Sequence, residues 1–146
     1  MKNDRLRVPI DEAYVVALGR AAYVFATLEW NAVWCCERMQ QNYIQRLGRK
    51  TAGQIAGDLA RLARRRPVHQ DQKACLEPAN EFSRLVLVRN SILHGKPGTA
   101  PSGAQRLFRD GSPWTAELID DAADQFATCS IGLNALLYNQ LKAKVP

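Results

Sequence analysis

The sequence lacks any run of eighteen apolar residues, and its first residues, "MKNDRLRVPIDEAY", are charged before an amphipathic pattern begins. A membrane-spanning helix needs about 20 mostly apolar residues in succession, so we expect no membrane span. A secretory signal peptide needs an apolar segment behind its basic start, and we expect none here. These absences favour a cytoplasmic protein.

Paired cysteines are also missing, since no two of the four cysteines form a C-x-x-C pair. Each lies among apolar residues, as is typical of a free thiol that packs like a small hydrophobic side chain. We therefore predict no disulfide framework, no metal site and no cofactor, which suits a reducing compartment. The four positions are Cys35, Cys36, Cys75 and Cys129.

Several common catalytic motifs are absent as well. The chain contains no H-E-x-x-H and no G-x-S-x-G, and no paired-carboxylate arrangement stands out. The segment "GKPG", residues 95–98, lacks the rest of a phosphate-binding P-loop. These absences disfavour zinc proteases, serine hydrolases and P-loop nucleotide hydrolases.

What the chain does contain is apolar residues at helical spacing. This spacing predicts helices over about 11–47, 52–65, 70–93 and from 115 onward, with Thr51 capping the second and Pro67 ending it. Between the last two helices, residues 95–114 are rich in Gly, Pro and Ser and predict a long loop or a short hairpin around Asp110-Gly111. We predict one all-α domain over 1–146, an antiparallel four-helix bundle.

The apolar faces predict which side chains meet. On the first helix, Tyr23, Trp30 and Trp34 widen the apolar face, which predicts a central helix or one covered by a second subunit. On the third helix, apolar residues form a stripe that should face the core. The stripe comprises Phe82, Leu85, Val86, Ile92 and Leu93.

Positive charge is unevenly distributed along the chain. The formal net charge is +6, and residues 46–66 contain seven basic residues against Asp58 alone. Such a patch attracts phosphates, so Arg61, Arg64 and Arg65 are candidates for contacts with RNA phosphates. The alternative is that these arginines only offset the macrodipole at the end of a helix, and the acidic residues of 117–124 do the same at the start of the next.

Three polar residues interrupt the apolar stretch "LVLVRNSILHG" near the end of the third predicted helix. Arg89 replaces an apolar residue on the inward stripe, and a buried guanidinium without a partner is too costly to persist. It needs a carboxylate, a water-filled cleft or a ligand phosphate, and Glu29 on the first helix is the best carboxylate. Asn90 and His94 are four residues apart and share a helix face.

An imidazole at a helix end titrates near neutral pH and suits general acid–base catalysis. A neighbouring arginine stabilises the charge of a pentavalent phosphate. Arg89 and His94 therefore suit RNA cleavage in which the ribose 2′-OH attacks the adjacent phosphate and no metal is needed. The alternative is a structural pair between Arg89 and Glu29, with His94 as a helix-terminating residue.

The segment "RNSILHG", Arg89 to Gly95, resembles the R-x4-6-H signature of HEPN domains, including a polar residue after the arginine. HEPN domains are small helical bundles, and many are ribonucleases of toxin–antitoxin, abortive-infection and CRISPR systems. In the catalytic members, the Arg and His of two subunits meet in a composite cleft at a dimer interface. The resemblance implies a homodimeric endoribonuclease with Arg89 and His94 as the catalytic pair, Asn90 as a polar helper, RNA as substrate and a protein antitoxin as a further partner.

Two observations bear on this resemblance. A second match, Arg64 to His69, contains Pro67 and lies outside any apolar stripe. Some HEPN toxins carry a tyrosine two residues after the histidine, which a partner enzyme modifies, whereas this chain has Lys96 there. Lys96 is instead a candidate for phosphate contact. The alternatives are a non-catalytic HEPN-like module that binds nucleotide, RNA or protein as a dimer, and a purely structural helical dimer.

Overall fold

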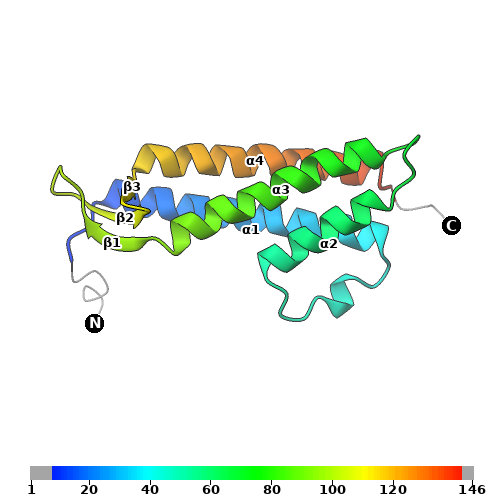
Figure 1. The fold of residues 1–146 in the computed structure, drawn as a ribbon, viewed down its shortest axis with the longest axis horizontal. Coiled ribbons are helices and arrows are strands. Elements are labelled where there is room, and N and C mark those ends of the chain that lie inside the picture. The colour runs from blue at the N-terminus through cyan, green and yellow to red at the C-terminus, as the bar shows by residue number, and fades with distance from the viewer. Residues whose placement is uncertain (1–7, 143–146) are drawn as a thin grey trace.

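The computed structural model describes residues 8–142, which form four α-helices, a short 3-10 helix and a small antiparallel sheet (Figure 1). The prediction of a helical protein is confirmed. In chain order the elements are α1 (Glu12–Met39), η1 (Ile44–Arg46), α2 (Ala52–Arg64), α3 (Gln72–Leu93), β1 (Lys96–Thr99), β2 (Gln105–Arg109), β3 (Ser112–Trp114) and α4 (Ala116–Asn139).

The first helix ends eight residues earlier than its apolar spacing predicts. After Met39 the chain leaves the helix, and the carboxylate of Glu37 accepts hydrogen bonds from the backbone amides of Asn42 and Ile44 at 3.1 and 2.8 Å. Asn42 and Gly48 take positive φ angles of 65° and 55°, which reverse the chain. The apolar residues beyond Met39 therefore belong to a loop, which leads back to the start of α2.

The second helix begins where the sequence predicts. The Thr51 hydroxyl accepts from the Gln54 amide at 3.3 Å, and the Gln54 side chain accepts from the Thr51 amide at 2.8 Å. This reciprocal capping box satisfies two backbone donors that the helix itself leaves unpaired. The third helix continues through Pro78, which lies inside it.

The segment before the last helix forms three strands rather than a loop with one hairpin. The predicted hairpin joins β2 and β3 at Asp110 and Gly111, whose φ angles of 50° and 79° suit a tight hairpin turn. Strand β1 was not predicted, and it pairs with β2 to give the order β1-β2-β3. Gly95 precedes β1 without a positive φ, and a Cβ there would lie 2.9 Å from the Leu107 Cβ. Its lack of a side chain thus permits the close approach of β2.

The helices do not form the predicted antiparallel bundle. Contacts between α1 and α4 join Arg20 to Asp120, Asn31 to Ser130 and Cys35 to Leu133, so both residue numbers increase together. The two helices therefore run parallel, side by side, while α3 runs in the opposite direction (Figure 1). The prediction failed because the loop from Met39 to α2 carries the chain back toward the end at which α1 began. Helix α2 therefore runs in the direction of α1, and α3 and α4 then follow in opposite directions (Figure 1).

One hydrophobic core receives side chains from all four helices. Phe25 stacks near Phe82 and meets Phe126 edge to face, with ring centroids 6.1 and 5.1 Å apart. The four cysteines are free and buried, and burial raises the pKa of Cys36 and of Cys129 to about 12. Within residues 8–142, no helix combines the length and apolarity that crossing a membrane requires.

Several apolar residues predicted to be buried are exposed. Leu93 is 50% exposed because Ile92, its neighbour, takes the inward position as α3 ends. Tyr23 and Trp30 are 77% and 49% exposed, so the broad apolar face of α1 is covered on one side only within a single chain. Spacing predicts that residues share a face, but it does not predict which face a neighbour covers.

Tyr14 fastens the sheet to the start of α1. Its hydroxyl donates to the Trp114 carbonyl at 2.8 Å and accepts from the Leu107 amide at 3.0 Å, and its side chain is fully buried. We predict that Tyr14→Phe lowers the free energy of unfolding by about 1–3 kcal/mol, because two partly buried backbone groups lose their partner. Urea denaturation measures this. Tyr138→Phe, at a tyrosine that is 68% exposed, is the matched control and should change little.

Candidate functional site

Arg89, Asn90 and His94 line one cleft at the C-terminal end of α3. The cleft has a volume of about 480 Å³. Its other walls come from α1 and from the loop that leads into α2, so three separate segments form it. The remaining lining residues are Glu29, Lys50, Thr51, Ala52 and Gly53.

Arg89 is oriented by contacts with two helices. Its guanidinium carbon lies 4.7 Å from the centroid of the Phe25 ring, and Nη1 donates to the Asn90 side-chain oxygen at 2.8 Å. A cation over an aromatic face is attracted by the ring quadrupole, which fixes the plane of the guanidinium. Asn90 therefore positions Arg89 from within the same helix.

The predicted partner of Arg89 is present. Arg89 Nη2 lies 3.7 Å from Glu29 Oε2, which makes an ion pair that is too long for a hydrogen bond. Burial raises the pKa of Glu29, although the charge of Arg89 acts in the opposite direction. The side chains are 24% and 33% exposed, so the pair is not sealed inside the protein. Arg89 thus faces both Glu29 and the open cleft.

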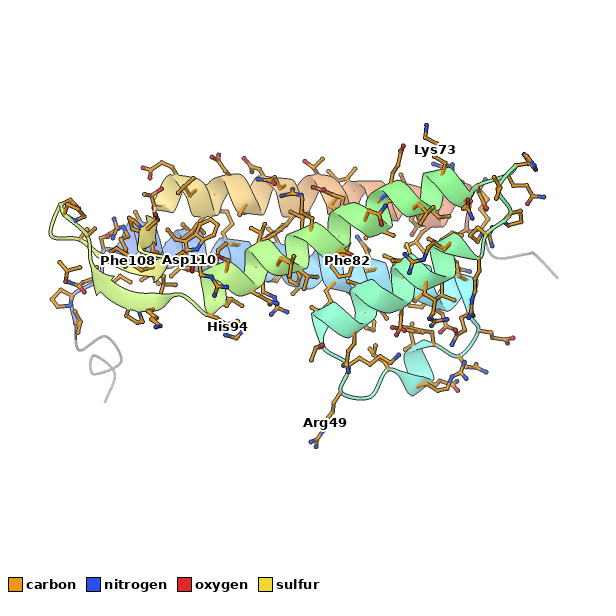
Figure 2. The ribbon with its side chains drawn as sticks, viewed as in Figure 1. Arg49, Lys73, Phe82, His94, Phe108 and Asp110 are labelled. Carbon is orange, nitrogen blue, oxygen red and sulfur yellow. The ribbon has the colours of Figure 1, made fainter. Side chains whose placement is uncertain are left out.

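His94 caps the C-terminal end of α3 and is exposed. Its backbone amide donates to the Asn90 carbonyl at 2.9 Å, while its imidazole hydrogen-bonds to none of the side chains in residues 8–142. Figure 2 shows the imidazole extending away from the helix end. His94 is therefore open to solvent at the edge of the cleft that Arg89 lines.

The opposite wall was not anticipated from the sequence. It is the start of α2, where the first backbone amides have no partner inside the helix and carry a partial positive charge. The Thr51 cap signals this helix start in the sequence. Nothing local in the sequence places it beside Arg89, because the two segments meet only through tertiary packing.

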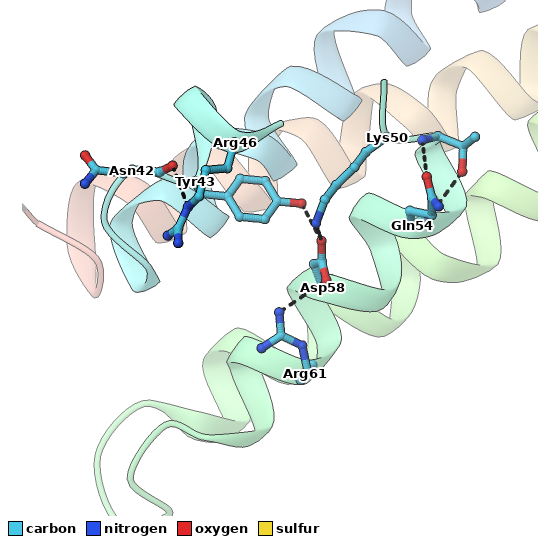
Figure 3. A network of polar contacts seen from close by, with 8 residues as sticks. Asn42, Tyr43, Arg46, Lys50, Gln54, Asp58 and Arg61 are labelled. Carbon is cyan, nitrogen blue, oxygen red and sulfur yellow. Dashed lines mark hydrogen bonds and ion pairs between the residues drawn. The ribbon is translucent and has the colours of Figure 1, made fainter. Parts of the chain in front are cut away.

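A polar network fixes this wall (Figure 3). Asp58 accepts hydrogen bonds from the Tyr43 hydroxyl at 2.8 Å and from Arg61 at 3.2 Å, and it also pairs with Lys50. Burial raises the pKa of Tyr43, as does its hydrogen bond to Asp58. Burial also acts to raise the pKa of Asp58, but its three donors outweigh this and hold that pKa below the usual 3.8. Asp58 thereby ties the loop before α2 to the helix that follows.

The structure brings together some of the predicted basic residues and separates others. Arg61 belongs to the Asp58 network, whereas Arg64 and Arg65 are exposed at the far end of α2, about 20 Å along the helix from Thr51. Lys96 is exposed at the start of β1 and does not line the cleft. The basic stretch of the sequence is therefore not one patch around Arg89.

Searches against models of known protein families, curated proteins and solved structures found no match.

We predict that Asp58→Asn lowers the free energy of unfolding by about 1–3 kcal/mol at neutral pH, because charged hydrogen bonds are lost. The pKa of Asp58 is lower in the folded state than in the unfolded state. Its carboxylate therefore stabilises the fold at pH values above the unfolded-state pKa, and this stabilisation is lost as the pH falls through the folded-state pKa. The difference in the free energy of unfolding between wild type and Asp58→Asn should therefore shrink below pH 3.8. Denaturation at several pH values measures it. Asp121→Asn, at an exposed carboxylate of α4, is the control and should show no such trend.

Proposed function

We propose that this chain is a metal-independent endoribonuclease of the HEPN type, acting as a homodimer in which Arg89 and His94 cleave RNA. The observation that carries the proposal is that both side chains line one open cleft, with Arg89 held beside Asn90 rather than buried. The chain is mostly helical, as the resemblance implies, although its helices do not form the predicted antiparallel bundle. By the same resemblance, we propose a cytoplasmic toxin or defence effector with a protein antitoxin.

The chemistry assigns one role to each group. His94 accepts the proton of the ribose 2′-OH, whose oxygen attacks the adjacent phosphorus. Arg89 stabilises the negative charge of the pentavalent phosphate. The bond from phosphorus to the 5′ oxygen then breaks, and the leaving oxygen takes that proton from the same His94. The products are a 2′,3′-cyclic phosphate and a 5′-hydroxyl end.

The electrostatics of the cleft support phosphate binding. Among the described residues that line the cleft, Glu29 is the only acidic one, whereas Arg89 and Lys50 are basic and Lys50 is paired with Asp58 outside the cleft. The long distance between Arg89 and Glu29 leaves guanidinium donors free for a phosphate oxygen, and the planar fork of arginine suits that contact. The start of α2 adds a partial positive charge.

The existing ion pair between Arg89 and Glu29 favours a second candidate function. In this alternative the chain is a non-catalytic HEPN-like dimer module that binds nucleotide, RNA or protein. Arg89 then serves to bind a ligand or to hold α1 against α3, and His94 only ends the helix. Activity of matched variants separates the two functions.

We predict that His94→Ala and Arg89→Ala each lower the rate of RNA cleavage by about 10²–10⁴-fold, as loss of a general base or of charge stabilisation does. Cleavage of a labelled single-stranded RNA in the presence of a chelator measures this. The double variant Arg64→Ala/His69→Ala removes the second R-x4-H match and is the matched control. Equal cleavage by wild type and His94→Ala contradicts the nuclease. RNA that binds but is not cut, with binding lost in Arg89→Ala, supports the alternative.

The composite cleft predicts complementation between variants. Homodimers of Arg89→Ala and of His94→Ala each lack one group, whereas a mixed dimer retains one intact arginine and one intact histidine on opposite subunits. We predict that subunit exchange between the two inactive variants restores measurable cleavage. If a mixture stays inactive although mass spectrometry shows mixed dimers, the site lies within one subunit.

A further inference from the structure

Five of the large apolar side chains that are exposed on α1 and α4 form what we call the aromatic face, namely Tyr23, Trp30, Trp34, Ile131 and Tyr138. The exposed fractions reach 77% at Tyr23, 71% at Ile131 and 68% at Tyr138. Trp30 and Trp34 are 49% and 38% exposed and pack edge to face, with ring centroids 6.3 Å apart. No side chain of the nuclease cleft belongs to this set.

Helix geometry places these residues on one side of the molecule. Tyr23 and Trp30 are seven residues apart, as are Ile131 and Tyr138, and this spacing keeps each pair on one helix face. The hydrogen bond from Asn31 to Ser130 sets Trp30 and Ile131 at the same level. Asn31 and Ser130 face each other across the contact between the two parallel helices. Trp30 lies one residue before Asn31, and Ile131 lies one residue after Ser130. A step of about 100° back on α1 and forward on α4 turns both pairs to the same side of the molecule.

The area of this face is at the upper end of what a monomer exposes and approaches one side of a protein interface. Aromatic side chains offer about 150–250 Å² each, so these exposed fractions amount to roughly 600 Å² of apolar surface. A standard interface buries about 800 Å² on each partner, whereas the largest apolar patch of a typical monomer is about 300–600 Å². With its polar rim, the aromatic face is large enough for one side of a stable dimer.

The charges around this face identify its occupant. At one end Arg20 is neutralised by Asp120 at 2.7 Å. The exposed α1 residues Tyr23, Thr27, Trp30 and Trp34 are uncharged. The charged residues that border the face are of both signs, namely Glu37 and Arg38 on α1 and Asp124 on α4, with Glu37 seven residues after Trp30 and Asp124 seven residues before Ile131. An apolar surface that is bordered by charges of both signs does not select a polyanion, and it is complementary to another copy of itself. An isologous contact, in which the same patch faces itself across a two-fold axis, meets this condition.

We propose that the aromatic face binds the aromatic face of a second copy of this chain. Trp30 and its neighbour Glu29 point to different sides of α1, because successive helix residues differ by about 100°. Glu29 lines the cleft and Trp30 does not. The contact is therefore separate from the dimer that the nuclease site needs and leaves the cleft open, so it goes beyond the proposed function.

Sedimentation velocity of the full chain over a wide concentration range tests this contact. Ile131→Asp and Trp30→Asp each place a charge in the interface and should weaken self-association at least tenfold, with circular dichroism verifying the fold. Val68→Asp alters an apolar residue that is 70% exposed outside the face and should leave association unchanged. In wild type, tryptophan emission should shift to the red on dilution, as Trp30 and Trp34 become exposed to water.

Several results would overturn the proposal. One is a wild type that stays monomeric at about 100 µM, and another is association that Val68→Asp weakens as much as Ile131→Asp does. A third is association that only Arg89→Ala and His94→Ala abolish, since it would place the sole interface at the cleft. Quenching of Trp30 and Trp34 emission by single-stranded RNA in a monomeric wild type would show base stacking instead. If the cleft variants lose nuclease activity but still associate, the result supports the contact through the aromatic face.

Discussion

The structure depends on α1, a helix of 28 residues whose buried side contacts elements from every other part of the fold. Tyr14 holds the sheet, Phe25 joins the rings of α3 and α4, and Tyr43 in the loop after the helix anchors the start of α2 through Asp58. The cleft exists because α3 ends beside this helix while the returning loop brings α2 to the same place. A shift of α1 would move both the ring beneath Arg89 and the carboxylate beside it.

Local chemistry made part of the fold predictable. The start of α2 follows from Thr51 and Gln54, and the turn between β2 and β3 follows from Asp110-Gly111, because each feature is decided by neighbouring residues. The end of α1 was not predictable in this way. Apolar spacing continues through Tyr43, which is buried, and the capping by Glu37 depends on a fold of the loop that no local motif announces. The parallel course of α1 and α4 depends in turn on that loop.

The site shows the same division. His94 follows Arg89 by five positions at the end of one helix, so their proximity follows from the sequence. The contact between Arg89 and Glu29 was predicted, because an inward guanidinium needs a carboxylate and Glu29 lies on the first helix. Arg64 and Arg65 belong to the same basic stretch, residues 46–66, as Lys50, which lines the cleft. They nevertheless lie at the end of α2 that is far from the cleft. Spacing along one helix is informative, whereas the assembly of a site from three segments requires the tertiary structure.

The most direct test of the central claim uses an RNA with one 2′-deoxyribose at the position where wild type cleaves. The measurement compares this substrate with the all-ribose strand, in excess chelator, by mass analysis of the ends. The account predicts that only the all-ribose strand is cut at that position, leaving a 2′,3′-cyclic phosphate. Cleavage of the deoxy-substituted strand at the same bond, or activity that disappears with the chelator, would contradict attack by the 2′-OH and with it the proposed roles of Arg89 and His94.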